Sequence, residues 1–121
     1  PILDGMVSAF TAEGRFGEAS SAADEYARRW PSSAASERAA WLAFRAGDYE
    51  RSIAAYRRAA EQDPRSVKAL NGVGVCALNA WLLSDRLDGT AREEARRAFE
   101  RSLELEPGQA RIETLLRTYA P

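Results

Sequence analysis

The stretch GDYERSIAAYRRAAEQDP, residues 47–64, decides the fold, because the chain contains two further versions of it. GRFGEASSAADEYARRWP lies 33 residues earlier, at residues 14–31, and EEARRAFERSLELEP follows at residues 93–107. The first two stretches begin with Gly14 and Gly47, and all three end on a proline. Recurrence of this kind indicates an architecture of stacked units.

Small and aromatic residues recur within the stretches at helical spacing. Aligned on the final proline, the stretches place Ala19, Ser52 and Ala95 at one position, Ala23, Tyr56 and Phe99 four residues later, and Tyr26, Ala59 and Ser102 after three more. These spacings put the set on one face of a helix. A further helical stretch precedes the second and third units, at residues 36–46 and from about residue 66. Two helices per period in the low thirties predict a solenoid of helical hairpins.

The pattern resembles the tetratricopeptide repeat family, in which Gly-x-Tyr is followed by Ala, an aromatic residue, Ala and Pro. The second unit matches it through Gly47, Tyr49, Tyr56, Ala59 and Pro64. The third unit matches through Leu70, Val73, Gly74, Ala95, Phe99, Leu103, Leu105 and Pro107. The first keeps Gly14, Phe16, Ala19 and Pro31 but has Ala23 in place of the large aromatic residue.

The resemblance implies an all-α fold, a right-handed α-solenoid of three tetratricopeptide-type hairpins plus a C-terminal capping helix. We expect one domain over residues 1–121, with repeats at about residues 1–32, 33–66 and 67–108. Residues 109–119 (QARIETLLRTY) are predicted to form the helix that covers the last repeat.

The third repeat is nine residues longer than the family's usual 34, since Pro64 and Pro107 are 43 residues apart. The surplus falls around NAWLLSDRLDGT, where Asn79–Leu83 can continue the first helix. One interpretation packs Trp81, Leu82 and Leu83 against the closing helix through Leu115, Leu116 and Tyr119. The other makes Trp81 and Leu82 a secondary contact surface, because aromatic anchors dominate many interfaces.

Local signals fix several helix ends. Asp48 is placed to cap the second helix of the second repeat, and Thr90 with Glu93 fits a capping box for that of the third. Asp63-Pro64 and Glu106-Pro107 lie where helices stop before a proline.

Composition excludes several classes of chemistry. The chain has no histidine and one cysteine, Cys76, so imidazole-based catalysis, an internal disulfide and a His-ligated metal site are all absent. We therefore expect no enzymatic activity, no cofactor and no metal. A net charge of −1 and no basic stripe argue against nucleic acid as a partner, and no apolar run predicts membrane insertion. Sixteen of the 17 basic residues are arginine, which we ascribe to a GC-rich genome.

What remains is a surface, and the resemblance implies where it lies. In this family the first helices of the repeats line a concave groove that binds peptides. Carried over by register, the groove comprises Glu37, Trp41, Phe44 and Arg45 in the second repeat and Lys68, Asn71, Gly72, Val75, Leu78 and Asn79 in the third. Asp4, Ser8 and Thr11 would be the first repeat's contribution.

These residues predict a non-catalytic scaffold that binds a peptide or protein segment. The family's clamp for chaperone peptides needs Lys and Asn where this sequence has Asp4 and Ser8, which argues against a chaperone co-factor role. An alternative makes the chain the repeat tail of a larger protein, packing on a fused domain or mediating self-association as a homo-oligomer. Pro1 cannot be an initiator, so we expect a processed chain or a fragment, and the absence of a signal or disulfide favours the cytoplasm.

Overall fold

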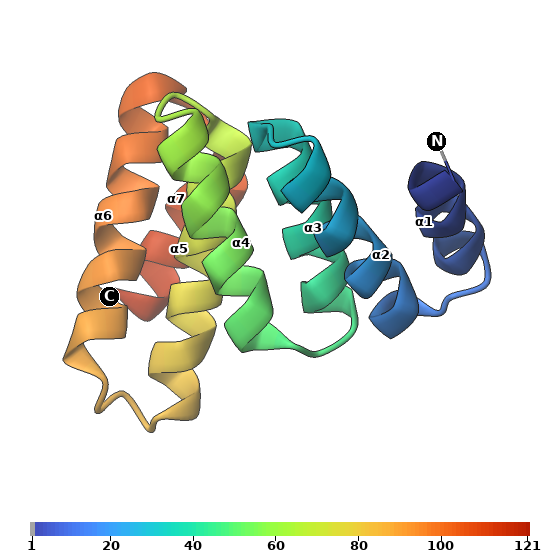
Figure 1. The fold of residues 1–121 in the computed structure, drawn as a ribbon. Helices are drawn as coiled ribbons and strands as arrows, with labels where there is room; N and C mark the ends of the chain where they lie inside the picture. Colours follow the sequence, from blue (N-terminus) through green and yellow to red (C-terminus); the bar gives the residue numbers. More distant parts are fainter. Residues whose placement is uncertain (1) are drawn as a thin grey trace.

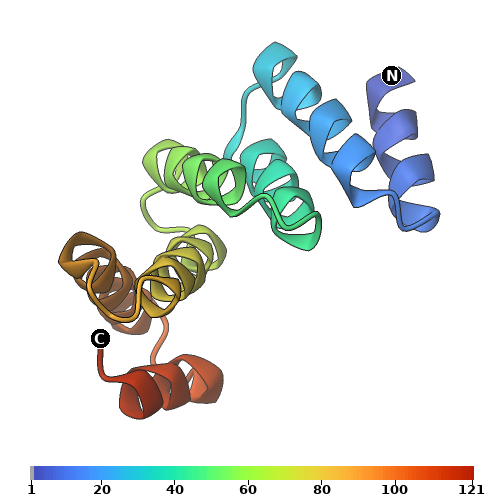
Figure 2. The same ribbon diagram turned by 90° about the horizontal axis from the view of Figure 1, so that it is seen from below.

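The computed structural model describes residues 2–121 as a row of antiparallel helices without a strand in that range. The helices are α1 (Ile2–Ala12), α2 (Phe16–Arg29), α3 (Ser33–Arg45), α4 (Tyr49–Gln62), α5 (Val67–Leu83), α6 (Gly89–Leu105) and α7 (Ala110–Tyr119). Consecutive helices pair as hairpins, and the hairpins stack along a curved row with α1 at one end and α7 beside α6 at the other (Figures 1 and 2). The fold is an all-α repeat solenoid, as the sequence predicts.

Short polar side chains set the helix starts. Ser32, Asp48, Ser66 and Asp88 each accept a hydrogen bond from the backbone N–H three residues on, which satisfies one of the free donors of the first turn. Asp48 thus caps α4, as predicted. The predicted capping box of Thr90 with Glu93 is wrong, because α6 begins at Gly89 and its cap is Asp88.

Glycine at two turns allows the hairpins to close. Gly14 and Gly47 adopt left-handed backbone conformations, with φ of 72° and 80°. Glycine has no Cβ to clash there, so the chain reverses within three residues. In the third repeat the turn is longer, and the residues with left-handed backbone conformations are Asp85 and Arg86, with φ of 54° and 64°.

The surplus of the third repeat is distributed over the whole hairpin. Compared with α3 and α4, helix α5 has four more residues, the turn two more and α6 three more. The extended end of the α5–α6 hairpin projects beyond its neighbour in Figure 1.

Aromatic rings seated on glycines hold the last hairpins together. The ring of Tyr56 on α4 lies against Gly72 of α5, and the ring of Phe99 on α6 lies against Gly74. A Cβ built on either glycine would overlap the ring that faces it. Helix α5 is therefore in close contact with α4 through Tyr56 and with α6 through Phe99. The Phe99 side chain is fully buried.

At the first junction between repeats the small residue lies on the earlier helix and the large residue on the later one, the reverse of the Tyr56–Gly72 pair. In register, α2 has the small Ala23 where α4 has Tyr56, and α3 has Arg38 where α5 has Gly72. The Arg38 guanidinium lies 4.8 Å from the centre of the Tyr26 ring and donates a hydrogen bond to Asp4 over 2.6 Å. Each junction therefore pairs one large residue with one small residue, although the large one lies on α3 at the first junction and on α4 at the second.

We expect Gly72→Ala and Gly74→Ala to lower the free energy of unfolding by about 1–3 kcal/mol, since the added methyl must displace a packed ring. Gly5→Ala is the matched control, because nothing in the described chain lies within 4 Å of a Cβ at that position of α1. It should instead raise stability by up to about 1 kcal/mol through helix propensity. Urea denaturation followed by circular dichroism measures all three, and equal effects would contradict the ring-on-glycine account.

Candidate functional site

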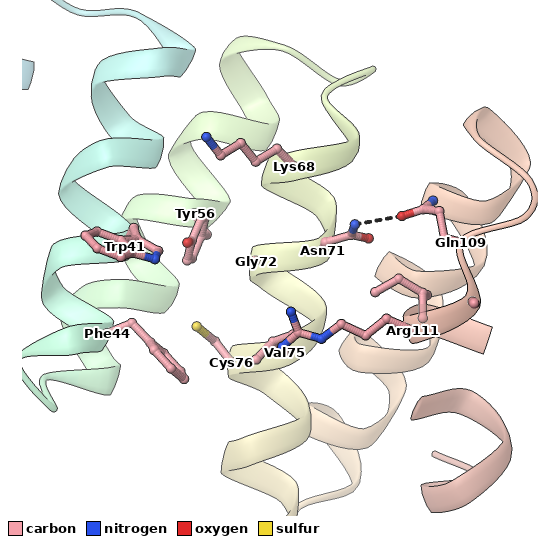
Figure 3. A pocket seen from close by; sticks show the side chains of 12 residues that line it. Trp41, Phe44, Tyr56, Lys68, Asn71, Gly72, Val75, Cys76, Gln109 and Arg111 are labelled. Atoms are coloured by element: carbon pink, nitrogen blue, oxygen red, sulfur yellow. Dashed lines mark hydrogen bonds between the residues drawn. The ribbon is translucent and has the colours of Figure 1, made fainter. Parts of the chain in front are cut away.

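A pocket of about 450 Å³ opens between α3, α5 and α7 on one side of the solenoid (Figure 3). Its walls come from four helices and the α6–α7 turn. The lining residues are Trp41, Phe44, Tyr56, Lys68, Asn71, Gly72, Val75, Cys76, Gln109, Ala110, Arg111 and Ile112.

Helical spacing places these side chains on one surface. Trp41 and Phe44 are one turn apart on α3, and Lys68, Asn71 and Val75 follow successive turns of α5. Between the two helices, the Tyr56 ring lies on Gly72 and forms the back wall, as Figure 3 shows. Because Gly72 has no side chain, the Tyr56 ring can lie against α5 and the space in front of the ring stays open.

A polar network fixes α7 as the far wall. The Asn71 amide donates to Gln109 Oε1 over 2.9 Å, and its carbonyl accepts from Ser102 Oγ over 2.5 Å. The Gln109 amide donates in turn to Ser102 Oγ over 2.9 Å and to the backbone carbonyl of Glu106 over 2.8 Å. Because Ser102 is fully buried, this network joins α5, α6 and the start of α7 at one point.

The charged groups that line the pocket are both cationic. Lys68 and Arg111 form no ion pair with any residue from 2 to 121. Both are exposed, and in Figure 3 they lie on opposite sides of the hollow. The pocket therefore combines an aromatic and aliphatic wall with two free positive charges.

The two buried titratable groups of the pocket wall, Cys76 and Tyr56, are held in their neutral forms. Burial raises the pKa of the Cys76 thiol, which lies 3.5 Å from Ser52 Oγ. Burial, with smaller effects from Cys76 and Glu37, raises the pKa of Tyr56 to about 12. A neutral buried thiol is a weak nucleophile, so the arrangement is suited to contact rather than to covalent chemistry. Residues 2–121 also contain no cluster of His, Cys, Asp or Glu side chains that could hold a metal ion.

The structure brings together six of the ten groove residues predicted in the second and third repeats. The residues that line the pocket are Trp41, Phe44, Lys68, Asn71, Gly72 and Val75. The amide nitrogen of Asn71 donates to Gln109 and its amide oxygen accepts from Ser102, so Asn71 holds the pocket wall together.

The other four predicted groove residues lie outside the pocket, and each has a physical reason. Leu78 is buried with Ala77 and Phe99 in the core of the last repeat, and Asn79 is half-buried beyond it. Glu37 accepts hydrogen bonds from Ser33 and Ser66, the latter over 2.6 Å, which ties α3 to the start of α5. Arg45 is exposed and stacks over the rings of Phe16 and Trp41 at 4.6 and 5.5 Å.

Trp81 is 5% exposed and cannot be a projecting contact anchor in this structure. It packs in the core between α5 and α6, and Leu82, Leu115, Leu116 and Tyr119 are partly buried against that core. The arginines Arg86 and Arg92 approach its ring at 5.3 and 5.7 Å. The large apolar side chains at the hairpin end that do reach solvent are Leu83 and Leu87, so the interpretation that packs Leu83 on the closing helix is wrong.

Sequence reasoning missed the contributions of α4 and α7. No groove residue is predicted from the sequence on either helix, whereas Tyr56, Arg111 and Ile112 line the pocket. A signal for α7 was present, because a helix that follows a complete repeat takes the position of the next first helix and therefore faces the same groove.

Comparisons with known proteins agree with this geometry. The tetratricopeptide repeat family pattern matches residues 6–64 and 37–88, so the chain belongs to the tetratricopeptide repeat family. The first TPR domain of Spaghetti (RPAP3), solved bound to the HSP90 peptide SRMEEVD, superimposes with a TM-score of 0.80 at 21% identity. The match covers 98% of this chain and 88% of that one. No curated protein sequence matches the chain, and within residues 2–121 no helix is long and apolar enough to cross a membrane.

Asn71→Ala should lower the free energy of unfolding by about 1–3 kcal/mol, because it removes the acceptor of the buried Ser102 hydroxyl and the donor to Gln109 Oε1. Asn79→Ala is the matched control on the same helix, since the Asn79 amide nitrogen has no hydrogen-bond partner within residues 2–121. It should cost clearly less. Equal costs in thermal or urea unfolding would show that the network does not hold α7.

The free energy of unfolding should fall as pH rises from about 10 to about 12. The ordinary pKa of tyrosine is 10.0, whereas that of folded Tyr56 is about 12, so the folded chain keeps the proton that the unfolded chain has lost. By linkage this costs stability with increasing pH, of the order of 2 kcal/mol at the upper end. Tyr56→Phe should reduce this slope in urea titrations at pH 9, 10 and 11, leaving the contribution of Cys76, whose pKa is also raised by burial. An unchanged slope would contradict the assignment.

Proposed function

We propose that the chain is a non-catalytic interaction module that binds a short segment of a partner protein in the pocket between α3, α5 and α7. The observation that carries the proposal is the composition of that pocket. Trp41, Phe44 and Val75 offer apolar contact, while Lys68 and Arg111 bring two unpaired cations to the same hollow.

This chemistry selects a segment with an apolar side chain next to acidic groups. An aliphatic or aromatic residue would enter between α3 and α5, against the Tyr56 ring. Acidic side chains would meet Lys68 and Arg111, where long-range attraction favours association more than it adds affinity. A pocket of this size supports binding of modest strength, because only a few side chains of the partner can be enclosed.

The likeness to the Spaghetti domain supports peptide binding as a class, since that domain was solved with an acidic peptide. The first repeat differs in what it offers. Asp4 is already engaged with Arg38, and Ser8 lies on the same helix without a nearby lysine. We therefore propose the contact at the second and third repeats and α7 rather than at the first repeat.

The alternative function, packing against a fused domain or a second copy, stays a prediction. The observation in favour of this alternative is that Leu83 and Leu87, at the end of the α5–α6 hairpin, are 71% and 84% exposed. Two exposed leucines are a small apolar area compared with a stable interface.

Selection of a random peptide library on the wild-type chain, with counter-selection on Val75→Arg, tests the pocket directly. We expect enriched peptides to carry an apolar residue beside acidic ones. Their Kd should rise at least about tenfold for Val75→Arg and for Lys68→Glu/Arg111→Glu, because a charge fills the apolar wall or reverses the local field.

Arg65→Glu/Arg117→Glu is the matched control, since it changes the net charge equally at two arginines outside the pocket. It should leave the Kd within about twofold, because exposed charges outside a contact add little. Peptides that lose affinity equally with both double variants would move the site away from the pocket.

A further inference from the structure

Beside the pocket, at the end of α3, aromatic rings hold the positive charge of Arg45 in place. Its guanidinium carbon lies 4.6 Å from the centre of the Phe16 ring and 5.5 Å from that of the Trp41 ring. Stacking occupies the face of a guanidinium and leaves the N–H groups at its edge available, in the fork geometry that suits a carboxylate. Because the rings already restrict the side chain, a ligand that binds it has less conformational freedom to remove.

Arg45 forms no ion pair with any residue from 2 to 121. Two carboxylates that are close to this stack in the sequence are engaged elsewhere. Asp48 accepts a hydrogen bond from the backbone N–H of Arg51, and Glu18 pairs with Arg15. Since Arg45 is also exposed, its stacked guanidinium is free to meet a carboxylate of another molecule.

Unpaired cations are concentrated on the first helices of the hairpins and on α7. On the second helices α2, α4 and α6, eight of the nine arginines form ion pairs, and the exception is Arg92. Of the five cations on α3, α5 and α7, only Arg38 forms one. The unpaired four are Arg45, Lys68, Arg111 and Arg117. The groove side of the solenoid therefore attracts acidic groups more strongly than the second helices do.

These cations lie at both ends of the apolar wall. In register, Arg45 corresponds to Asn79 of α5, which is eleven residues beyond Lys68. That separation is ~16 Å along the helix axes. Trp41 and Val75 share a register position between the two levels, and Figure 3 shows Lys68 toward the start of α5 from them. An extended chain advances about 3.3 Å per residue, so about five residues span the distance.

We propose that the groove binds an extended acidic segment of a partner protein, in which an apolar residue has Asp or Glu on both sides. The acid on one side meets Lys68 and Arg111, and the acid on the other side, about five residues away, meets Arg45. Phe16 and Trp41 act as positioning residues for Arg45. The contact at Arg45 rests on the proposed function, because the apolar residue between the two acids enters the pocket between α3, α5 and α7.

Further hairpins do not fill this surface, because it does not lie at an end of the row. A hairpin before α1 or after α7 would stack on the outer face of that helix, so it would lengthen the groove and leave it open. A second copy does not offer the required segment either. Asp85 and Asp88 flank Leu87, but they belong to a closed turn, and Asp88 accepts the backbone N–H of Ala91 as the cap of α6.

The probe for the test is a heptapeptide library with leucine fixed at the centre and three randomised positions on each side. Selection on the wild-type chain should enrich Asp and Glu on both sides of the leucine. Selection on Arg45→Gln should lose the acidic preference on one side and keep it on the other. Arg92→Gln is the matched control, since Arg92 is also exposed, unpaired and near a tryptophan ring, at 5.7 Å, but lies on α6 outside the pocket. It should leave both preferences unchanged.

Fluorescence anisotropy with the enriched peptide measures the contact itself. Arg45→Gln should raise its Kd about threefold to tenfold, because a charge-assisted hydrogen bond is lost. Arg45→Glu should weaken binding further, and a peptide with Lys in place of the acid on that side should restore it. Phe16→Leu keeps the charge and removes one stacking ring. It should raise the Kd about twofold for the enriched peptide, and leave unchanged that of a peptide with Gln at the same position, a difference that a loss of stability alone would not produce.

The outcomes separate this contact from the proposed function. An acidic preference that Arg45→Gln does not change, or one that wild type shows on a single side, would overturn the contact at Arg45 while the enriched peptides still respond to Val75→Arg. No enriched peptide, or none sensitive to Val75→Arg, would overturn the proposed function and this contact together. Self-association in sedimentation that Arg45→Glu abolishes would make a second copy the occupant, which would also overturn the proposal.

Discussion

The contact on which the rest of this structure depends is an aromatic ring seated on a glycine of the neighbouring helix. Tyr56 rests on Gly72 and Phe99 on Gly74, so α5 is approached closely from both sides. Close approach buries the alanine-rich faces around it, which have little side-chain volume of their own to fill a wider gap. A larger residue at either glycine has to displace the ring that faces it.

The same contact shapes the candidate site. Because Tyr56 is held flat against α5, it forms the back of the pocket between α3 and α5 instead of filling it. The Asn71, Ser102 and Gln109 network then sets α7 at the distance that closes the third side. Stability and the proposed recognition thus involve neighbouring residues of one helix face, so the effect of a pocket substitution on binding has to be measured apart from its effect on folding.

Stacking also explains how the repeats can differ in sequence while remaining equivalent in shape. At the first junction the larger residue of the pair is Arg38 of α3, and at the second it is Tyr56 of α4. The ion pair between repeats also reverses: the earlier helix contributes the acid at the first junction (Asp24 with Arg51) and the base at the second (Arg57 with Glu94). Each junction needs complementary sizes and charges, but neither side needs a particular residue.

The sequence by itself determined the helical hairpins, their order and most of their ends, because periodicity, proline and capping residues act within one or two turns. It also placed Trp41 and Val75 on the groove side through the register of the first helices. Only the tertiary structure decided that Leu78 and Trp81 are buried, since the lengthened third hairpin folds back on α7. It likewise decided that Arg111 faces the groove. Those outcomes depend on where a distant helix docks, and no local pattern encodes that distance.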